Sequence, residues 1–204
     1  MDKMKELYGL HDNYNNKLIG SVGCYNHRYF FPLSKEDLSS IKDWRNTQMD
    51  ILRQWRPLTD RNQENWYHVV SEDNHQVIFS IKECNQDAAT QLIGYCGITN
   101  IDYINRRGEI SFLVDPSRAE DLTLYQPDIF AVLNHLCQYG FDRLNLHKLF
   151  TETFDFRVKH ISLLEQFGMH LDGVIREHQY IRGNYHNSVI HSILQSEWNQ
   201  IREV

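Results

Sequence analysis

The chain of 204 residues is poor in the features that define several large classes of protein. It has only four cysteines, and Cys24, Cys84, Cys96 and Cys137 lie far apart without a C-x-x-C pair. This spacing predicts reduced, mostly buried cysteines and argues against a disulfide framework or a cysteine zinc site. Eleven histidines are present, but they form no H-x-x-x-H pair and no ligand cluster with cysteine, so no metal is expected.

Long apolar runs and basic runs are missing as well. No stretch approaches the length of a membrane span, and no cleavable apolar core follows the charged start at residues 1–6, so a cytoplasmic protein without a membrane partner is expected. The net charge of −6 comes without any run of lysine and arginine, which argues against a nucleic-acid partner. No repeat interrupts the chain, and its length predicts one domain with a substantial core.

The C-terminal part of the chain carries the clearest pattern. Residues 148–155 alternate apolar and polar side chains as a strand does, and Gly168 stands where a helix would end in a left-handed residue. Arg182-Gly183-Asn184 is typical of a short hairpin connection. The predicted elements of this part are the strand 148–155, a helix marked by Val158, Ile161, Leu164 and Phe167, and strands at 174–181 and 185–194.

The N-terminal part predicts two helices and then three strands. Ser34, with Asp37 three residues later, is a candidate N-cap of the first helix, and Thr59 of the second. Pro127 fits the first turn of a long amphipathic helix. The remaining predicted elements are a strand from Arg28, strands at 76–83, 91–100 and 106–115, and the helix 126–144. Residues 1–24 lie outside this pattern, and either an appended hairpin or a dimer arm would fit them.

In the order of its elements and in the residues at their boundaries, the chain resembles the GNAT N-acyltransferase superfamily. The most similar branch is that of ribosomal-protein-alanine and sugar-nucleotide amine acetyltransferases. The resemblance covers about Tyr25 to Trp198 and rests on DWRN (43–46), RQWRPLTDRNQENWY (53–67), IGYCGITNIDYINRRGEISFLVDP (93–116), LNLHKL (144–149), SLLEQFGMHLDGVIREHQYIRGNYHN (162–187) and ILQSEW (193–198). It implies a mixed α/β fold, with a mostly antiparallel twisted sheet flanked by helices and with splayed central strands. Residues 25–204 would form this domain after an extension at 1–24.

The activity that the resemblance implies is direct transfer of an acyl group from acetyl-CoA to an amine, without a covalent acyl-enzyme. The main chain at Phe112, Leu113 and Val114 would bind the pantetheine arm by strand addition. The family's glycine-rich phosphate turn is absent, because the matching segment 117–128 contains no glycine and has Arg118 as its one cation. A carrier-protein thioester as donor, or a binding module without catalysis, therefore stays open.

The resemblance also points to three residues for proton transfer and donor binding. Glu109 matches the strand glutamate that takes the proton of the amine, although an ion pair with Arg106 or Arg107 would explain it equally well. Arg157 and His160 stand where the family has a donor-binding Asn-x-x-Ser pair: Arg157 could hold a phosphate, and His160 could protonate the leaving thiolate. A solvated helix start is the alternative for His160. Glu177, near Gln179, is a second candidate base.

Acceptor recognition in this branch comes from the loop between the first two helices. Arg53, Trp55 and Arg56 suit a planar or anionic group by stacking and bidentate bonding, although Trp55 could instead pack in the core. Tyr185, with His186, would close the opposite wall. We therefore expect a small-molecule amine as acceptor, such as a nucleotide-activated amino sugar, with a protein N-terminus as the alternative and a homodimer as a possible assembly.

Overall fold

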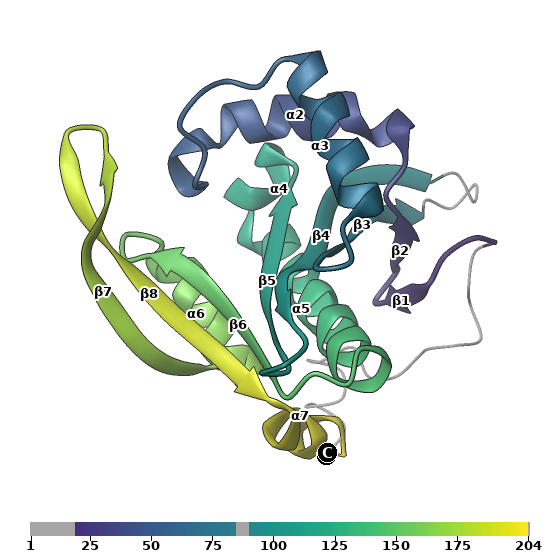
Figure 1. Ribbon diagram of the computed structural model, residues 1–204, viewed down its shortest axis with the longest axis vertical. Coiled ribbons are helices and arrows are strands. Elements are labelled where there is room, and N and C mark those ends of the chain that lie inside the picture. The colour runs from purple at the N-terminus through teal and green to yellow at the C-terminus, as the bar shows by residue number, and fades with distance from the viewer. Residues whose placement is uncertain (1–18, 85–89, 204) are drawn as a thin grey trace.

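The computed structural model describes residues 19–84 and 90–203, and in this part of the chain eight strands form one twisted sheet (Figure 1). Their order is β1-β2-β3-β4-β5-β6-β8-β7, and every neighbouring pair is antiparallel except β5 and β6. The strands are β1 (Gly23–Tyr25), β2 (Arg28–Pro32), β3 (Val77–Cys84), β4 (Thr90–Asp102), β5 (Arg107–Val114), β6 (Lys148–Phe154), β7 (His170–Ile181) and β8 (Asn184–Leu194). The predicted mixed fold with a mostly antiparallel sheet is confirmed.

Helices cover both faces of the sheet. They are α2 (Leu38–Thr47), α3 (Asp60–Glu72), α4 (Pro116–Glu120), α5 (Leu122–Gln138), α6 (Val158–Phe167) and α7 (Gln195–Arg202), together with the 3-10 turns η1 (Lys35–Asp37) and η2 (Met49–Ile51) and the π-helical turn η3 (Tyr139–Arg143). Figure 1 shows α2 and α3 side by side over one end of the sheet and the β7–β8 hairpin extending beyond the other.

Strand periodicity divides the core into two apolar clusters. Tyr95 and Leu113 face α2 and α3 in one cluster, whereas their chain neighbours Cys96 and Val114 belong to the other, which contains the buried side of α5. Successive side chains of a strand point to opposite faces, so β4 and β5 anchor helices on both sides at once. This double anchoring makes β5 a rigid wall.

The sheet opens between β5 and β6. The two strands pair only at Arg107↔Lys148, Gly108↔Leu149 and Glu109↔Phe150. Beyond Glu109, β5 continues along β4 and β6 continues along β8. The predicted splay is therefore confirmed, and it leaves the second half of β5 with one free edge.

Two predicted helix boundaries are confirmed. Gly168 ends α6 at φ 104°, a left-handed conformation that suits glycine. The Thr59 side chain accepts from the Asn62 N–H at 3.3 Å and caps α3.

Other boundaries differ from the prediction. Ser34 makes no cap to the main chain, because its hydroxyl donates to the Asp37 carboxylate and a 3-10 turn begins the helix instead. The long helix starts at Leu122, so Pro127 lies inside α5 and not in its first turn. The missing N–H of Pro127 is tolerated because the carbonyl it would serve belongs to the exposed Thr123. Helix α7 was not predicted.

The predicted extension at 1–24 lies largely outside the described residues. Gly23 and Cys24 pair with Phe30 and Tyr29 at the edge of the sheet. Among the helices of the described segments, none combines the length and apolar character of a membrane span. The four cysteines form no disulfide: Cys96 and Cys137 are buried, while Cys24 and Cys84 are half-buried.

Candidate active site

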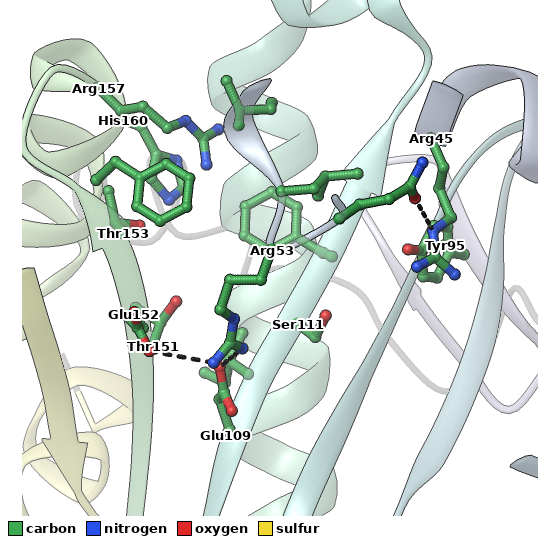
Figure 2. Close-up of a pocket in the computed structure, with 16 residues that line it drawn as sticks. Arg45, Arg53, Tyr95, Glu109, Ser111, Thr151, Glu152, Thr153, Arg157 and His160 are labelled. Atoms are coloured by element: carbon green, nitrogen blue, oxygen red, sulfur yellow. Dashed lines mark hydrogen bonds and ion pairs between the residues drawn. The ribbon is translucent and has the colours of Figure 1, made fainter. Parts of the chain in front are cut away.

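A cavity of about 210 Å³ occupies the opening between β5 and β6 (Figure 2). Its floor is formed by residues 109–112 of β5 and 151–154 of β6, and one wall by Arg157 and His160 at the start of α6. The segment 51–54, which follows η2, closes the other side. Three segments that are distant in the sequence therefore meet at the free edge of β5.

Along this edge, the main-chain N–H and C=O groups of successive residues point alternately to β4 and to the opening. The Asp115 N–H donates to the Ile93 carbonyl at 2.9 Å, which fixes the phase of the β4–β5 ladder. Because bonded pairs alternate along antiparallel strands, the polar groups of Leu113 face β4, whereas those of Phe112 and Val114 face the opening. Of the three positions predicted to bind a pantetheine arm, the structure thus offers Phe112 and Val114. The Val114 carbonyl accepts from Gln48 Nε2 at 2.8 Å, so a side-chain amide already binds this edge.

One buried and one half-buried carboxylate share a cation at the narrow end of the cavity. The Arg53 guanidinium forms an ion pair with Glu109 Oε1 and lies 3.1 Å from Glu152 Oε2. Glu109 is 3% exposed, and its second oxygen accepts from Asn100 Nδ2 at 2.7 Å. Figure 2 shows Arg53 reaching between the two strands that carry the acids. The structure therefore brings together a predicted base and a predicted acceptor-binding residue.

The ion pair that was the alternative explanation for Glu109 is not formed. Arg106 donates to Asn145, and Arg107 lies 3.5 Å from Asp102. The reason is geometric, because the β4–β5 ladder shifts register between Thr99 and Asp102 and separates this end of the hairpin from the cavity.

Sequence reasoning missed Glu152. Its Oε1 accepts from the Ser188 hydroxyl at 2.6 Å and lies 3.2 Å from His178 Nδ1, so β6, β7 and β8 all hold this carboxylate. The sequence did contain a signal for Glu152. It is an acid in the middle of a strand with a buried face, where a carboxylate is rare unless it is paired.

His160 is buried and not solvated, so the alternative of an exposed helix start is wrong. Its Nδ1 lies 3.2 Å from the Tyr125 hydroxyl, and Arg157 donates to the same hydroxyl at 2.9 Å. Burial, followed by the charge of Arg157, holds the pKa of His160 well below its ordinary value. Tyr125 was not predicted, because it lies 35 residues away on α5.

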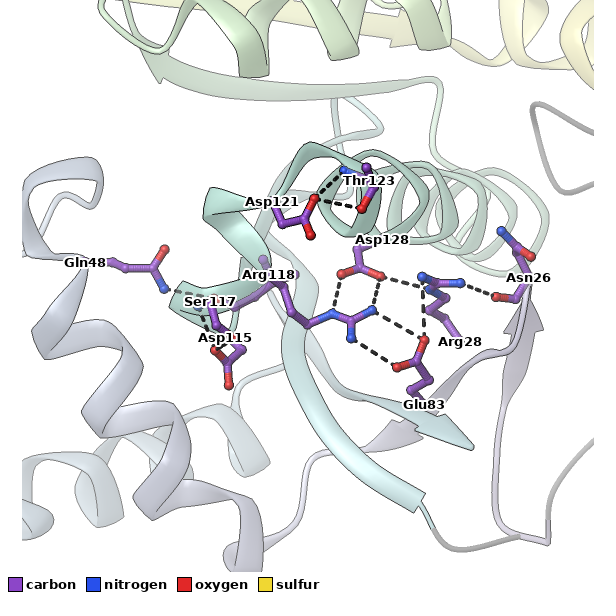
Figure 3. Close-up of polar contacts among 11 residues, drawn as sticks. Asn26, Arg28, Gln48, Glu83, Asp115, Ser117, Arg118, Asp121, Thr123 and Asp128 are labelled. Carbon is purple, nitrogen blue, oxygen red and sulfur yellow. Dashed lines mark hydrogen bonds and ion pairs between the residues drawn. The ribbon is translucent and has the colours of Figure 1, made fainter. Parts of the chain in front are cut away.

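Arg118 does not line the cavity. It lies instead in a network of charged side chains (Figure 3). Its guanidinium donates to both oxygens of Asp128, at 2.6 and 2.8 Å, and to Glu83 at 3.0 Å. Asp128 is fully buried and also accepts from Arg28 at 2.9 Å. The hydrogen bond to Asp128 raises the pKa of Arg118 above its ordinary value. Binding of the acyl donor by Arg118 therefore stays a prediction. The network disfavours it, because the guanidinium is already paired with Asp128 and Glu83.

The segment expected to replace a glycine-rich turn is helical. Asp115 accepts from the Ser117 N–H at 2.8 Å and begins α4, and Asp121 accepts from the Thr123 N–H at 2.8 Å and begins α5. The Thr123 hydroxyl, followed by the Thr123 N–H, holds the pKa of Asp121 below its ordinary value. One N–H in the first turn of each helix thus already has an anionic partner from the chain itself.

The other predicted acceptor residues do not line the cavity. Trp55 is 83% exposed, so a core position for it is excluded, and the Arg56 guanidinium stacks on its ring at 4.9 Å. Tyr185 lies on the β7–β8 hairpin against Tyr180, with ring centres 5.0 Å apart. Glu177 sits at an irregularity of β7 with φ 50°.

Within residues 19–84 and 90–203, no group of three or more His, Cys, Asp or Glu side chains is arranged to hold a metal ion.

The chain was compared with known proteins. Residues 32–190 match the family model of the acetyltransferase (GNAT) domain. A spermidine N(1)-acetyltransferase of Vibrio cholerae is 28% identical over 171 residues, which cover 81% of this chain and 92% of the relative. The crystal structure of spermidine N-acetyltransferase from the same organism, in complex with CoA and spermine, superposes with a TM-score of 0.75 at 24% identity and covers 85% and 98% of the two chains. A dodecameric structure of that enzyme has a TM-score of 0.71 at 26% identity, with coverage of 84% and 96%.

Proposed function

This chain belongs to the GNAT acetyltransferase family and is an N-acetyltransferase, and from that premise we propose that it moves an acetyl group from acetyl-CoA to a primary amine of a small polycation of the polyamine class. The observation that carries the acceptor assignment is the position of the Arg53 guanidinium between Glu109 and Glu152. The relatives named as spermidine acetyltransferases point in the same direction.

The paired acids favour a cationic acceptor. Two carboxylates with little exposure need a positive partner, since an unpaired buried charge is costly. Arg53 supplies that charge from a loop, and its side chain is 47% exposed, so it is the member of the trio that can swing out into solvent. An alkylammonium could take its place between the same oxygens. An anionic acceptor would be repelled by both carboxylates.

Catalysis would then use groups already at the opening. An ammonium is not a nucleophile, so Glu109, directly or through a water molecule, accepts its proton. The free amine attacks the thioester carbonyl, the new C–N bond forms, and main-chain N–H groups on the free edge of β5 stabilise the oxyanion. The C–S bond breaks as the intermediate collapses, and the thiol leaves without an acyl-enzyme.

Acetyl-CoA as donor is supported by the free edge at Phe112 and Val114 and by the CoA complex of the structural relative. The helical segment 117–128 should bind the phosphates of the acyl donor more weakly than a glycine-rich turn would. The reason is that the carboxylates of Asp115 and Asp121 already cap its helix N-termini. This feature keeps a carrier-protein thioester as the alternative donor.

A second acceptor class is favoured by a different observation. Trp55 and Arg56 form an exposed cation and ring stack on the same loop as Arg53. Such a platform suits the base or phosphates of a nucleotide-activated amino sugar. We keep this class as the second candidate, and a protein N-terminus as the third.

The experiment is a comparison of acceptors with acetyl-CoA, in which release of free thiol is measured. Spermidine, a nucleotide-activated amino sugar and a peptide with N-terminal alanine are tested at equal concentration. We expect the highest kcat/KM for spermidine. A higher value for the sugar nucleotide would overturn the polyamine assignment, and thiol release that no amine accelerates would overturn the proposed reaction.

Assembly and location stay proposals. The dodecamer of the structural relative supports a homo-oligomer, of which the predicted homodimer would be one unit. The cytoplasm stays a prediction from the sequence.

A further inference from the structure

The hydroxyl of Tyr125 joins two residues of the cavity wall. It lies 2.9 Å from an Arg157 nitrogen and 3.2 Å from His160 Nδ1. A guanidinium can only donate, so the tyrosine oxygen accepts from Arg157, and the phenolic proton is left available for donation to His160 Nδ1. Tyr125 is 6% exposed and comes from α5, whereas its two partners come from α6.

This contact determines which nitrogen of His160 carries the proton. Burial keeps the imidazole neutral at neutral pH, so it holds a single proton. With the Tyr125 hydroxyl as the donor to Nδ1, that proton is on Nε2. The ring of His160 lines the cavity, and its centre lies 5.5 Å from that of Phe112, whose main chain faces the opening. The Nε2–H group is therefore the donor that His160 offers beside the free edge of β5.

We propose that Tyr125 is a positioning residue for departure of the thiol: it holds His160 as the Nε2–H tautomer and replaces the proton that His160 gives away. The inference rests on the proposed acetyl transfer. As the C–S bond breaks, its electron pair stays on sulfur, which takes the proton from Nε2. Nδ1 takes the phenolic proton, and Arg157 stabilises the phenolate. Water then reprotonates Tyr125, while the proton held by Glu109 and the second proton of the attacking nitrogen pass to solvent, so the net products are the amide, a neutral thiol and one proton.

The surroundings of the pair suit this role. Burial raises the pKa of Tyr125, and Arg157, which donates to its hydroxyl, opposes that rise because a cation stabilises a phenolate. His191 of β8 and Arg157 are the other ionisable groups that act on His160, and both disfavour a second proton on it. The negative charge of Asp128, also on α5, raises the pKa of Tyr125. Asp128 itself forms ion pairs with Arg28 and Arg118. The charged neighbours thus keep His160 a neutral donor.

The first test is spectroscopic and independent of any acceptor. The ¹⁵N shifts of the His160 imidazole, assigned with His160→Gln, should show the Nε2–H tautomer in the ligand-free protein. Tyr125→Phe keeps the ring and removes the hydroxyl, and it should yield a mixture of tautomers. Tyr139→Phe is the matched control, because Tyr139 is partly buried at the far end of the same helical run and packs on Phe79. An Nδ1–H tautomer in the unmodified protein, or no change in Tyr125→Phe, would overturn the proposal.

The second test separates a chemical role from a packing role. With acetyl-CoA, Tyr125→Phe should lower kcat by about tenfold to a hundredfold, in the range of general acid catalysis, and leave KM for the donor unchanged. With S-phenyl thioacetate the loss should vanish, because an aryl thiolate leaves without a proton. Equal losses with both donors, or no loss with acetyl-CoA, would overturn the proposal. Failure of the proposed function is seen separately, as absence of acetyl transfer by the unmodified protein.

Discussion

Glu109 belongs to the last pair that β5 makes with β6, and Glu152 lies two residues beyond that pair on β6, yet one Arg53 guanidinium joins the two carboxylates. The splay creates the space between the two acids, and burial makes a shared cation necessary. The same geometry that opens the sheet for a donor thus builds a cation site at its narrow end.

Substitution Glu152→Gln should weaken binding of a polyamine more than turnover. The loss of one charged hydrogen bond, worth about 1.5–3 kcal/mol, predicts a rise in KM of roughly tenfold to a hundredfold with kcat little changed. Steady-state kinetics with spermidine measure this. Glu72→Gln, at the exposed end of α3, is the control and should behave like the unmodified protein. An unchanged KM would remove Glu152 from acceptor binding.

Substitution Glu109→Gln should act on the chemical step. Loss of a general base predicts a fall in kcat of about a hundredfold to ten-thousandfold. Binding of coenzyme A, measured by titration calorimetry, should be retained because the donor edge at Phe112 and Val114 is intact. Unmodified turnover in this variant would exclude Glu109 as the base.

Substitution Arg53→Met distinguishes the two leading acceptor classes. For a polyamine, KM should fall, because the competing guanidinium is gone and both carboxylates are left for the substrate. For a nucleotide-activated amino sugar, KM should rise, because a cation near the phosphates is lost. The free energy of unfolding of the variant, measured in urea, should also be about 1–3 kcal/mol lower, because the buried Glu109 loses its positively charged partner.

Substitution Asp128→Asn should destabilise the fold. Asp128 accepts from Arg28 and Arg118 with no exposure, and breaking such a buried pair costs about 3–5 kcal/mol. The free energy of unfolding in urea measures this. Arg118→Met is the companion variant, and an unchanged KM for acetyl-CoA in it would show that Arg118 serves the fold and not the donor.

Acid should destabilise the protein through His135. Burial lowers the pKa of His135 to about 3, below the value of about 6.5 in the unfolded chain. The unfolded state therefore binds a proton first, and as the pH falls from about 6.5 towards 3 the contribution of this group is lost at about 1.4 kcal/mol per pH unit. Urea unfolding at pH 7, 6 and 5 tests this: His135→Asn should show a shallower decline. An identical decline in both proteins would contradict the assignment.

Much of the fold was predictable because it depends on local signals. Gly168, Thr59 and the alternation in β6 follow from the conformational preferences of a few neighbouring residues, and the structure confirms them. Pro127 was misplaced for the same reason: its preference for a first turn is real, but the cap at Asp121 and burial of α5 from Tyr125 onward extend the helix past it.

The sequence by itself determined the order of the main elements from β2 to β8, the family resemblance, and Glu109, Arg53, Arg157 and His160 as candidates. Only the tertiary structure decided which side chains meet: Arg53 and Glu109 across 56 residues, Tyr125 and His160 across 35, and Arg118 and Asp128 across 10. Periodicity reports which face of an element is buried, whereas the meeting of two polar side chains depends on strand order and on where the sheet splays. Those are properties of the whole packed chain, in which each buried charge must find a counter-charge wherever the fold brings one close.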